Sequence, residues 1–338
     1  MTSVKPEFAH LAPDLTVCRI LNGMWQTAGG HGQIRPDGAV EEMVSYHEAG
    51  LTTWDMADIY GPAEEFFGKF RKNLASKRGE RELSNVQGLT KFVPNPGPMT
   101  RTIVEHHIER SMKRMGVKKI DAVQFHWWDY NDASYIDALH HLSKLRDEGK
   151  IGYIALTNFD TERVETMVEN GFRLVSNQVQ YSIVDMRPEV RMAPYCQKNN
   201  MKILSYGTLL GGFLSEKYLG RGEPARGDLY TLSLQKYKNM IDAWGGWGLF
   251  QELLGVLDAV AKRHGVLIAN VATRYILDRP AVAGVIIGTR LGISEHISDN
   301  LKTFGLRLDT KDLAEIRQVT SRSNDLYESI GDCGSEYR

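Results

Sequence analysis

The sequence predicts an α/β fold in which eight parallel strands, with helices between them, close into a (β/α)8 TIM barrel. Three observations lead to this prediction. Short β-rich runs alternate with longer amphipathic runs, and the alternation gives eight units. The first strand is followed by LNGMWQTAGGHG, which lacks the glycine fingerprint of an open dinucleotide-binding sheet. The length of 338 residues suits one such barrel with insertions.

Each expected strand is a short apolar run bounded by turn-forming residues. The eight runs cover residues 17–21, 51–54, 83–90, 120–125, 151–156, 174–179, 202–205 and 282–287. Helices are expected at 38–50, 101–115, 134–149, 161–170, 248–264 and 267–278. Gly50 is suited to end the first helix, and Asp160 is suited to cap the helix that follows it.

Two segments exceed the needs of a barrel. Residues 215–247 form a long insertion before the last units, and residues 306–338 form a C-terminal helix, expected at 310–322, and a tail. No low-complexity linker or break in composition divides the chain. We therefore expect one barrel domain over residues 1–338.

The charge balance excludes several classes of partner. With 41 basic and 42 acidic residues, the net charge of −1 argues against a nucleic-acid-binding surface. Three scattered cysteines fit neither a disulfide framework nor a zinc site, and they favour a reducing compartment. The N-terminus lacks the apolar stretch of a signal peptide, and no apolar run is long enough to span a bilayer. We expect a cytoplasmic protein with no membrane partner.

Polar residues follow the expected strands at the ends where a barrel carries its active site. From the second strand to the eighth they are Asp55 and Tyr60, Lys91, His126, Thr157 and Asn158, Gln178, Tyr206, and finally Gly288, Thr289 and Arg290. Each has an ordinary explanation alone: Asp55 or Asp58 as a helix cap, Lys91 as a solvated side chain, His126 as an interior residue. Because burying polar groups without partners is costly, one shared polar pocket explains the whole set better.

The residue types indicate acid–base chemistry without a nucleophile. An ammonium near a phenol lowers the phenol pKa, and a carboxylate can hold that ammonium in place. A phenol tuned in this way beside a histidine suits proton delivery to a carbonyl oxygen. No side chain supplies a hydride, so a nicotinamide cofactor is expected.

The later strands offer a place for that cofactor. Asn158 and Gln178 can pair with a carboxamide, and Tyr206 can stack on the nicotinamide ring. The glycine-rich turn 207–212 and the segment 288–294 can bind phosphates through backbone N–H groups. Arg290 is a candidate for a ribose 2′-phosphate, which favours NADP(H) over NAD(H), and a solvated surface arginine is the competing interpretation.

At these residues the sequence resembles the aldo-keto reductase superfamily, over about residues 17–306. WDMADIYGPAEEFFG is similar to the family's signature after the second strand. The resemblance implies that Tyr60 is the general acid, that Lys91 lowers its pKa, that Asp55 pairs with Lys91, and that His126 positions the carbonyl. The implied cofactor contacts are Trp25, Asp55, Asn158, Gln178, Tyr206, Gly207, Leu209, Gly211, Gly288, Thr289, Arg290, His296 and Asn300.

Parts of the chain depart from the family pattern. The segment GTRLGISEH is longer than in many members, which weakens the preference for NADP over NAD. The loop MWQTAGGHG and the insertion at 215–247 resemble the branch of bacterial stress-type reductases and potassium-channel β subunits.

An aromatic substrate pocket is also predicted. Its expected lining is Trp25, Tyr60, Phe92, His126 and Trp127, with Trp128 and either Trp244 or Trp247 as further candidates. Aromatic walls suit planar or sugar substrates. The alternative is that several of these rings simply pack the barrel rim.

Three functions are compatible with these residues. The first is an NAD(P)H-dependent oxidoreductase that reduces an aldehyde or ketone, or oxidises an alcohol or sugar. The second is a regulatory subunit that senses nicotinamide redox state with little turnover. The third, a metal-dependent barrel hydrolase, is disfavoured because no HxH motif follows the first strand, and no metal is expected. The oligomeric state stays open.

Overall fold

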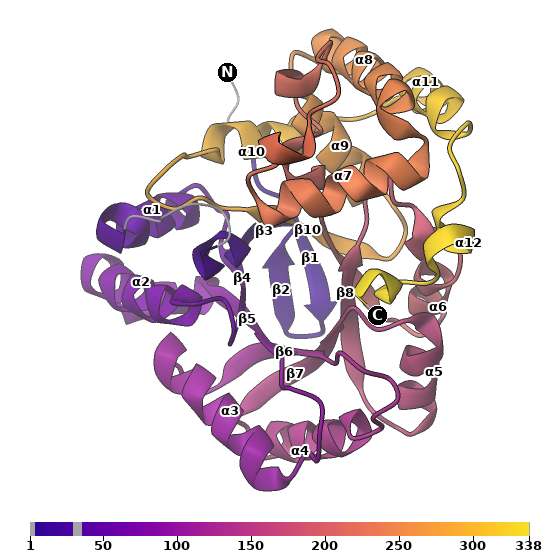
Figure 1. Ribbon diagram of the computed structural model, residues 1–338. Helices are drawn as coiled ribbons and strands as arrows, with labels where there is room; N and C mark the ends of the chain where they lie inside the picture. Colours follow the sequence, from indigo (N-terminus) through magenta and orange to yellow (C-terminus); the bar gives the residue numbers. More distant parts are fainter. Residues whose placement is uncertain (1–3, 30–35, 338) are drawn as a thin grey trace.

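The computed structural model of the chain describes residues 4–29 and 36–337. Eight parallel strands form a closed barrel in the order β10-β3-β4-β5-β6-β7-β8-β9 (Figure 1). Their bounds are β3 Ile20–Gly23, β4 Thr53–Ala57, β5 Gln87–Phe92, β6 Ile120–His126, β7 Ile151–Thr157, β8 Leu174–Gln180, β9 Lys202–Tyr206 and β10 Val282–Gly288. Because β10 pairs with β3, with Val285 opposite Ile20, the ring has no free edge. The predicted fold class is confirmed.

A short antiparallel hairpin precedes the barrel and was not predicted. It consists of β1 (Phe8–Ala12) and β2 (Leu15–Cys18). The expected strand at 17–21 is therefore wrong, because its first residues belong to β2 and the barrel strand starts at Ile20. Leu11, Leu15 and Val17 of the hairpin are buried in a cluster with side chains from the interior of the barrel. The hairpin thus closes the N-terminal end of the barrel, behind the strands in Figure 1.

Helices surround the barrel, and the predicted ones are confirmed with small shifts of their ends. Their bounds are α1 Pro36–Glu48, α2 Ala63–Arg78, α3 Arg101–Met115, α4 Tyr135–Asp147, α5 Thr161–Glu169, α6 Met192–Lys198, α8 Gly246–His264, α9 Ile268–Leu277, α10 Ile297–Gly305 and α11 Thr310–Thr320. Asp160 caps α5 as expected, because its Oδ1 accepts from the backbone N–H of Arg163 at 2.9 Å. The strand expected at 83–90 begins later, at Gln87, because a 3₁₀ helix occupies Glu80–Asn85.

Two segments outside the repeat lie at the C-terminal end of the barrel. The insertion at 215–247 contains α7 (Leu232–Trp244), which runs beside the barrel mouth in Figure 1. The tail contains α12 (Leu326–Ile330) and a 3₁₀ turn, Ser335–Tyr337, that returns to the same mouth. In the loop MWQTAGGHG, Trp25–Ala28 form another 3₁₀ turn, and residues 30–32 lie outside the described residues. No helix in the described ranges is long and apolar enough to cross a membrane.

Candidate active site

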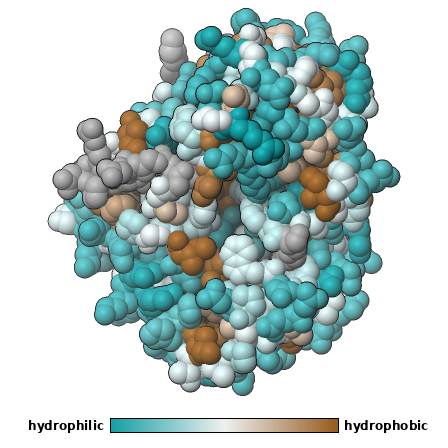
Figure 2. All heavy atoms as spheres, viewed as in Figure 1, coloured by the Kyte–Doolittle hydropathy of each residue, from teal (hydrophilic) through white to brown (hydrophobic). Residues whose placement is uncertain are grey.

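A cavity of about 770 Å³ opens at the C-terminal ends of the barrel strands, where the face seen in Figure 2 is hollowed. This volume lies within the range of small-molecule and cofactor sites. The structure brings the four predicted catalytic residues, Asp55, Tyr60, Lys91 and His126, to this one cavity. Of the predicted cofactor contacts, those that also line it are Trp25, Asn158, Gln178, Tyr206, Gly207, Leu209, Gly211, Gly288, Arg290, His296 and Asn300.

A buried ion pair forms the floor of the cavity. Lys91 Nζ lies 2.6 Å from Asp55 Oδ2, and each residue is 3% exposed. The amide groups of Gln124 and Gln178 both donate to Asp55 Oδ1 at 2.7 Å. The carboxylate is therefore held from three directions, and its charge is compensated in the way that burial of an ion requires.

Gln124 is a member of this network that was not predicted. It lies two residues before His126 on β6, so the two side chains point to the same face of the strand. The alternation of a β-strand was the signal that could have found it.

Tyr60 lies over the ion pair. The Lys91 ammonium is 4.9 Å from the centroid of the Tyr60 ring, and the Trp25 ring meets that ring edge-on at a centroid distance of 4.9 Å. Burial raises the pKa of Tyr60 well above its ordinary value, and the nearby Asp55 carboxylate raises it further. The direction is opposite to the expected lowering by Lys91. Burial also lowers the pKa of Lys91 itself, and the Asp55 carboxylate opposes that shift.

His126 is held in one tautomer by the neighbouring strand. Its Nδ1 lies 3.0 Å from the Thr157 carbonyl oxygen, which can only accept, so Nδ1 carries a proton. In the neutral imidazole the lone pair is then on Nε2. The ring also packs edge-on against Trp128, with centroids 4.3 Å apart.

Polar groups on the opposite side of the floor match the expected nicotinamide contacts. Asn158 has a left-handed backbone (φ 59°), a conformation that asparagine tolerates better than most residues. Its Oδ1 accepts from the Tyr206 hydroxyl at 2.8 Å. Because Gln178 uses its amide nitrogen for Asp55 and for Gln124 Oε1, its remaining acceptor is Oε1. A carboxamide, which is both donor and acceptor, suits this pair of amides.

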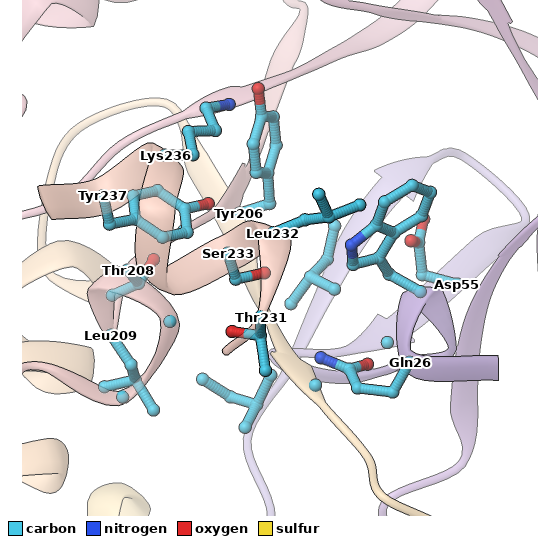
Figure 3. A pocket seen from close by; sticks show the side chains of 18 of the residues that line it. Gln26, Asp55, Tyr206, Thr208, Leu209, Thr231, Leu232, Ser233, Lys236 and Tyr237 are labelled. Carbon is cyan, nitrogen blue, oxygen red and sulfur yellow. The ribbon is translucent and has the colours of Figure 1, made fainter. Parts of the chain in front are cut away.

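Helix α7 contributes a wall that was not predicted. Figure 3 shows Ser233, Lys236 and Tyr237 of α7 around the same pocket as Tyr206, with Gln26 and Asp55 on the other side. The spacing of the three α7 residues, i, i+3 and i+4, places them on one face of the helix. The sequence could show that face, but not that it meets the barrel mouth.

Several predicted residues lie elsewhere. Phe92 and Trp127 follow inward-facing Lys91 and His126, so strand alternation turns them outward, and neither lines the cavity. Phe92 packs on Phe125, and the Trp127 indole donates to the Asp129 carbonyl at 2.7 Å. These two predictions for the substrate pocket are wrong.

Three further candidates are also absent from the cavity lining. The Thr289 hydroxyl donates to the Gly23 carbonyl at 2.9 Å and is buried, so its side chain does not line the cavity. Trp244, the last residue of α7, and Trp247, in α8, are buried in the core.

Asp55, within β4, and Asp58, just after it, do not act as helix caps. No side chain caps α2, whose N-terminal neighbour is Pro62. Asp58 Oδ1 instead accepts from the Val93 backbone N–H at 3.3 Å, and its Oδ2 lies 3.2 Å from His107 Nδ1. Asp58 is therefore a buried support behind the site rather than a cap.

Comparison with known proteins agrees with the fold and shows the family. The family model described as "Aldo/keto reductase family" matches residues 19–321. The chain is 27% identical to aldo-keto reductase YhdN of Bacillus subtilis, over 93% of this chain and 92% of that protein. It is 28% identical to flagellar radial spoke protein 5 of Chlamydomonas reinhardtii, of which it spans about half (49%) and which matches 66% of this chain.

Among solved structures, the glycerol dehydrogenase of Gluconobacter oxydans superposes with a TM-score of 0.78 and 21% identity, over 96% of this chain and 98% of that one. In residues 4–29 and 36–337, no three or more His, Cys, Asp and Glu side chains form a group that could hold a metal ion. With the family model covering most of its length, the chain belongs to the aldo/keto reductase family of oxidoreductases, which reduce carbonyls or oxidise the corresponding alcohols.

Proposed function

We propose that the protein is an NADPH-dependent reductase of aldehydes or ketones, which in reverse oxidises the corresponding alcohol or sugar, with Tyr60 as the general acid. One observation supports this most: the buried Asp55–Lys91 pair lies beneath the Tyr60 phenol, and His126 lines the same cavity. This arrangement provides a proton donor and a polar group for a carbonyl oxygen at one place.

The side chains divide the work in the following way. Bound nicotinamide supplies the hydride. Tyr60, protonated at neutral pH, donates its proton to the carbonyl oxygen, and the Lys91 ammonium stabilises the phenolate that remains. Neutral His126 presents an acceptor at Nε2 and so orients an alcohol, whereas the imidazolium presents a donor and orients a carbonyl.

The same cavity provides groups that fit a dinucleotide. Asn158 and Gln178 suit the carboxamide, and Tyr206 suits the face of the ring. Gly207 and Gly288 line the cavity without a side chain, which leaves room for a ligand there, and Gly207 has a left-handed backbone (φ +71°) that favours glycine. The N-terminus of α10 provides backbone N–H groups for an anion.

The substitution Tyr60→Phe tests the assigned acid. It removes the proton donor and leaves the ring in place, so carbonyl reduction is expected to fall by about 10²–10⁴-fold. Cofactor affinity, measured by fluorescence titration, is expected to stay within about twofold, because the hydroxyl is proposed to act only on the carbonyl oxygen. Tyr153→Phe, a tyrosine packed with the hairpin cluster, is the matched control. Undiminished turnover in Tyr60→Phe would refute the assignment.

The choice of NADPH rests on Arg290, which lines the cavity next to α10. An arginine bound to a 2′-phosphate contributes about 1.5–3 kcal/mol, or at least tenfold in affinity. Arg290→Ala is therefore expected to raise the KM for NADPH about tenfold or more and to leave the KM for NADH nearly unchanged. An equal change for both cofactors would contradict this role.

A panel of aldehydes separates the reductase from the redox-sensing alternative. Steady oxidation of NADPH with at least one aldehyde is the expected result. Tight cofactor binding with negligible turnover on every carbonyl tested would favour the sensor.

A further inference from the structure

The last residues that the structure describes reach the cavity. We name residues 331–337 the C-terminal strap. Its Tyr337 lines the cavity, with its ring centroid 6.3 Å from the His126 ring and 6.4 Å from the Trp128 ring, edge-on to both. Tyr337 is 37% exposed, so it stands beside the catalytic histidine at the outer edge of the cavity.

A buried ion network anchors the strap. Arg187 binds both carboxylate oxygens of Asp185 at 2.8 Å and reaches Glu336 at 3.0 Å, with the three side chains 1%, 0% and 6% exposed. Arg187 Nη1 also donates to the carbonyls of Gly331 and Asp332 at 3.4 and 3.3 Å. Removing one member of such a network leaves a buried charge, so the strap has a strongly preferred position.

A second set of contacts joins the strap to α7 and to the cofactor side. The Tyr337 hydroxyl lies 3.1 Å from the Tyr206 hydroxyl and accepts from the Lys236 ammonium. That ammonium lies 4.1 Å from the centroid of the Tyr337 ring and 5.2 Å from that of Tyr206. Cation–π contact of this kind holds the ring in one orientation. Tyr337 is thus fixed through Glu336 on one side and through Lys236 on the other.

We propose that Tyr337 is a specificity-determining residue that forms the outer wall of the substrate compartment and restricts it to small carbonyl compounds. This inference rests on the proposed function. A substituent that extends from a carbonyl at His126 toward Trp128 meets the Tyr337 ring, which its contacts prevent from turning away. A bulky planar aldehyde is excluded by this wall, whereas a short polyhydroxy aldehyde fits in front of it.

The test compares a small aldehyde, glyceraldehyde, with a bulky one, 2-naphthaldehyde. In Tyr337→Ala the ratio of kcat/KM for naphthaldehyde to that for glyceraldehyde is expected to rise at least tenfold, mainly through a lower KM for naphthaldehyde. This variant keeps Glu336, so the ion network stays intact. Tyr327→Ala changes the same residue type on nearby α12, outside the cavity lining, and is expected to leave the ratio unchanged.

A binding measurement gives a readout that does not depend on turnover. Quenching of tryptophan fluorescence by 2-naphthaldehyde is expected to give a Kd at least fivefold lower for Tyr337→Ala than for the parent protein. An unchanged kcat/KM ratio together with an unchanged Kd would refute the proposal that Tyr337 restricts the size of the substrate. If the parent protein reduces neither aldehyde while the Kd still decreases in Tyr337→Ala, the proposed function is refuted but the role of Tyr337 in limiting ligand size is supported.

Discussion

At the scale of single residues, the environment of Tyr60 decides what the phenol can do. Burial, and then the Asp55 carboxylate, raise its pKa well above 10, and the Lys91 ammonium at 4.9 Å from the ring does not reverse this. The phenol is therefore protonated throughout the neutral range. In the proposed reaction this protonated state would donate to the carbonyl oxygen during reduction, whereas alcohol oxidation would require the phenolate.

The two reaction directions should consequently respond differently to pH. A raised pKa keeps the protonated form present at every pH below it, so the reduction kcat should show no Tyr60-dependent loss between about pH 6 and about pH 9. Oxidation needs the phenolate, whose fraction rises about tenfold per pH unit over that range. Profiles of kcat in both directions test this. A reduction rate that falls between about pH 7 and pH 9 through a group that Tyr60→Phe removes would contradict it.

The sequence could predict the polar floor of the site but only part of its aromatic lining: Trp25 and Trp128 line the cavity, whereas Phe92 and Trp127 do not. Strand ends point to one mouth in any parallel barrel, so Asp55, Lys91 and His126 could be assigned from their positions in the chain. Phe92 and Trp127 directly follow Lys91 and His126 in the chain, so the alternation of the strand turns their side chains away from the cavity. Tyr337 could not have been predicted, because its position depends on ion pairs formed across more than a hundred residues.

At the scale of elements, the packing of α7 on the glycine-rich turn decides the shape of the cofactor side. Gly207 has a φ of +71°, and a Cβ there would lie 2.4 Å from the Tyr237 hydroxyl. Gly207 is therefore required for two reasons: its backbone is left-handed, and it lies in close contact with helix α7.

Replacing a glycine that has both a left-handed backbone and a close helix contact should destabilise the protein more than replacing a glycine that has the left-handed backbone alone. Gly207→Ala should cost about 1–2 kcal/mol for the left-handed backbone and an additional amount for displacing α7. Gly265→Ala is the control, since its φ is +66° and no atom lies within 4 Å of the added Cβ. Urea unfolding should show a greater loss for Gly207→Ala, together with weaker cofactor binding. Equal losses of stability would show that the contact with Tyr237 does not matter.

Elements that carry their own signals were predictable from the sequence. Caps and terminal glycines identified helices such as α5, whose cap Asp160 is confirmed. The hairpin was missed because its second strand and the first barrel strand are separated by Arg19 alone and form one apolar run. The position of α7 depends on tertiary contacts, and no local pattern reveals such contacts.

At the scale of the whole molecule, the hairpin completes the barrel core. Leu15 is 6% exposed and packs with Leu21, Leu89 and Leu204 from the barrel strands. The hairpin lies at the opposite end of the barrel from the cavity. A substitution in it should therefore change the stability of the protein without changing the activity of the folded enzyme.

The substitution Leu15→Ala should lower the free energy of unfolding by about 2–5 kcal/mol, as for other buried leucines. The kcat of the folded fraction should stay unchanged. Phe8→Ala changes a side chain of the same hairpin that is 49% exposed, and should change stability by at most about 0.5 kcal/mol. Denaturant unfolding and steady-state kinetics on both variants provide the test. A loss of kcat in Leu15→Ala that matches its loss of stability would mean that the two ends of the barrel are coupled.

The closure of the barrel at the N-terminal ends of its strands has a kinetic consequence for the proposed reaction. In the described part of the chain, side chains of the barrel strands and of the hairpin fill the barrel interior, so no passage crosses it, and both proposed reactants would have to enter and leave through the cavity at the C-terminal ends of the strands. For the proposed reaction we therefore expect the reactant that binds deeper in this cavity to bind first and to leave last.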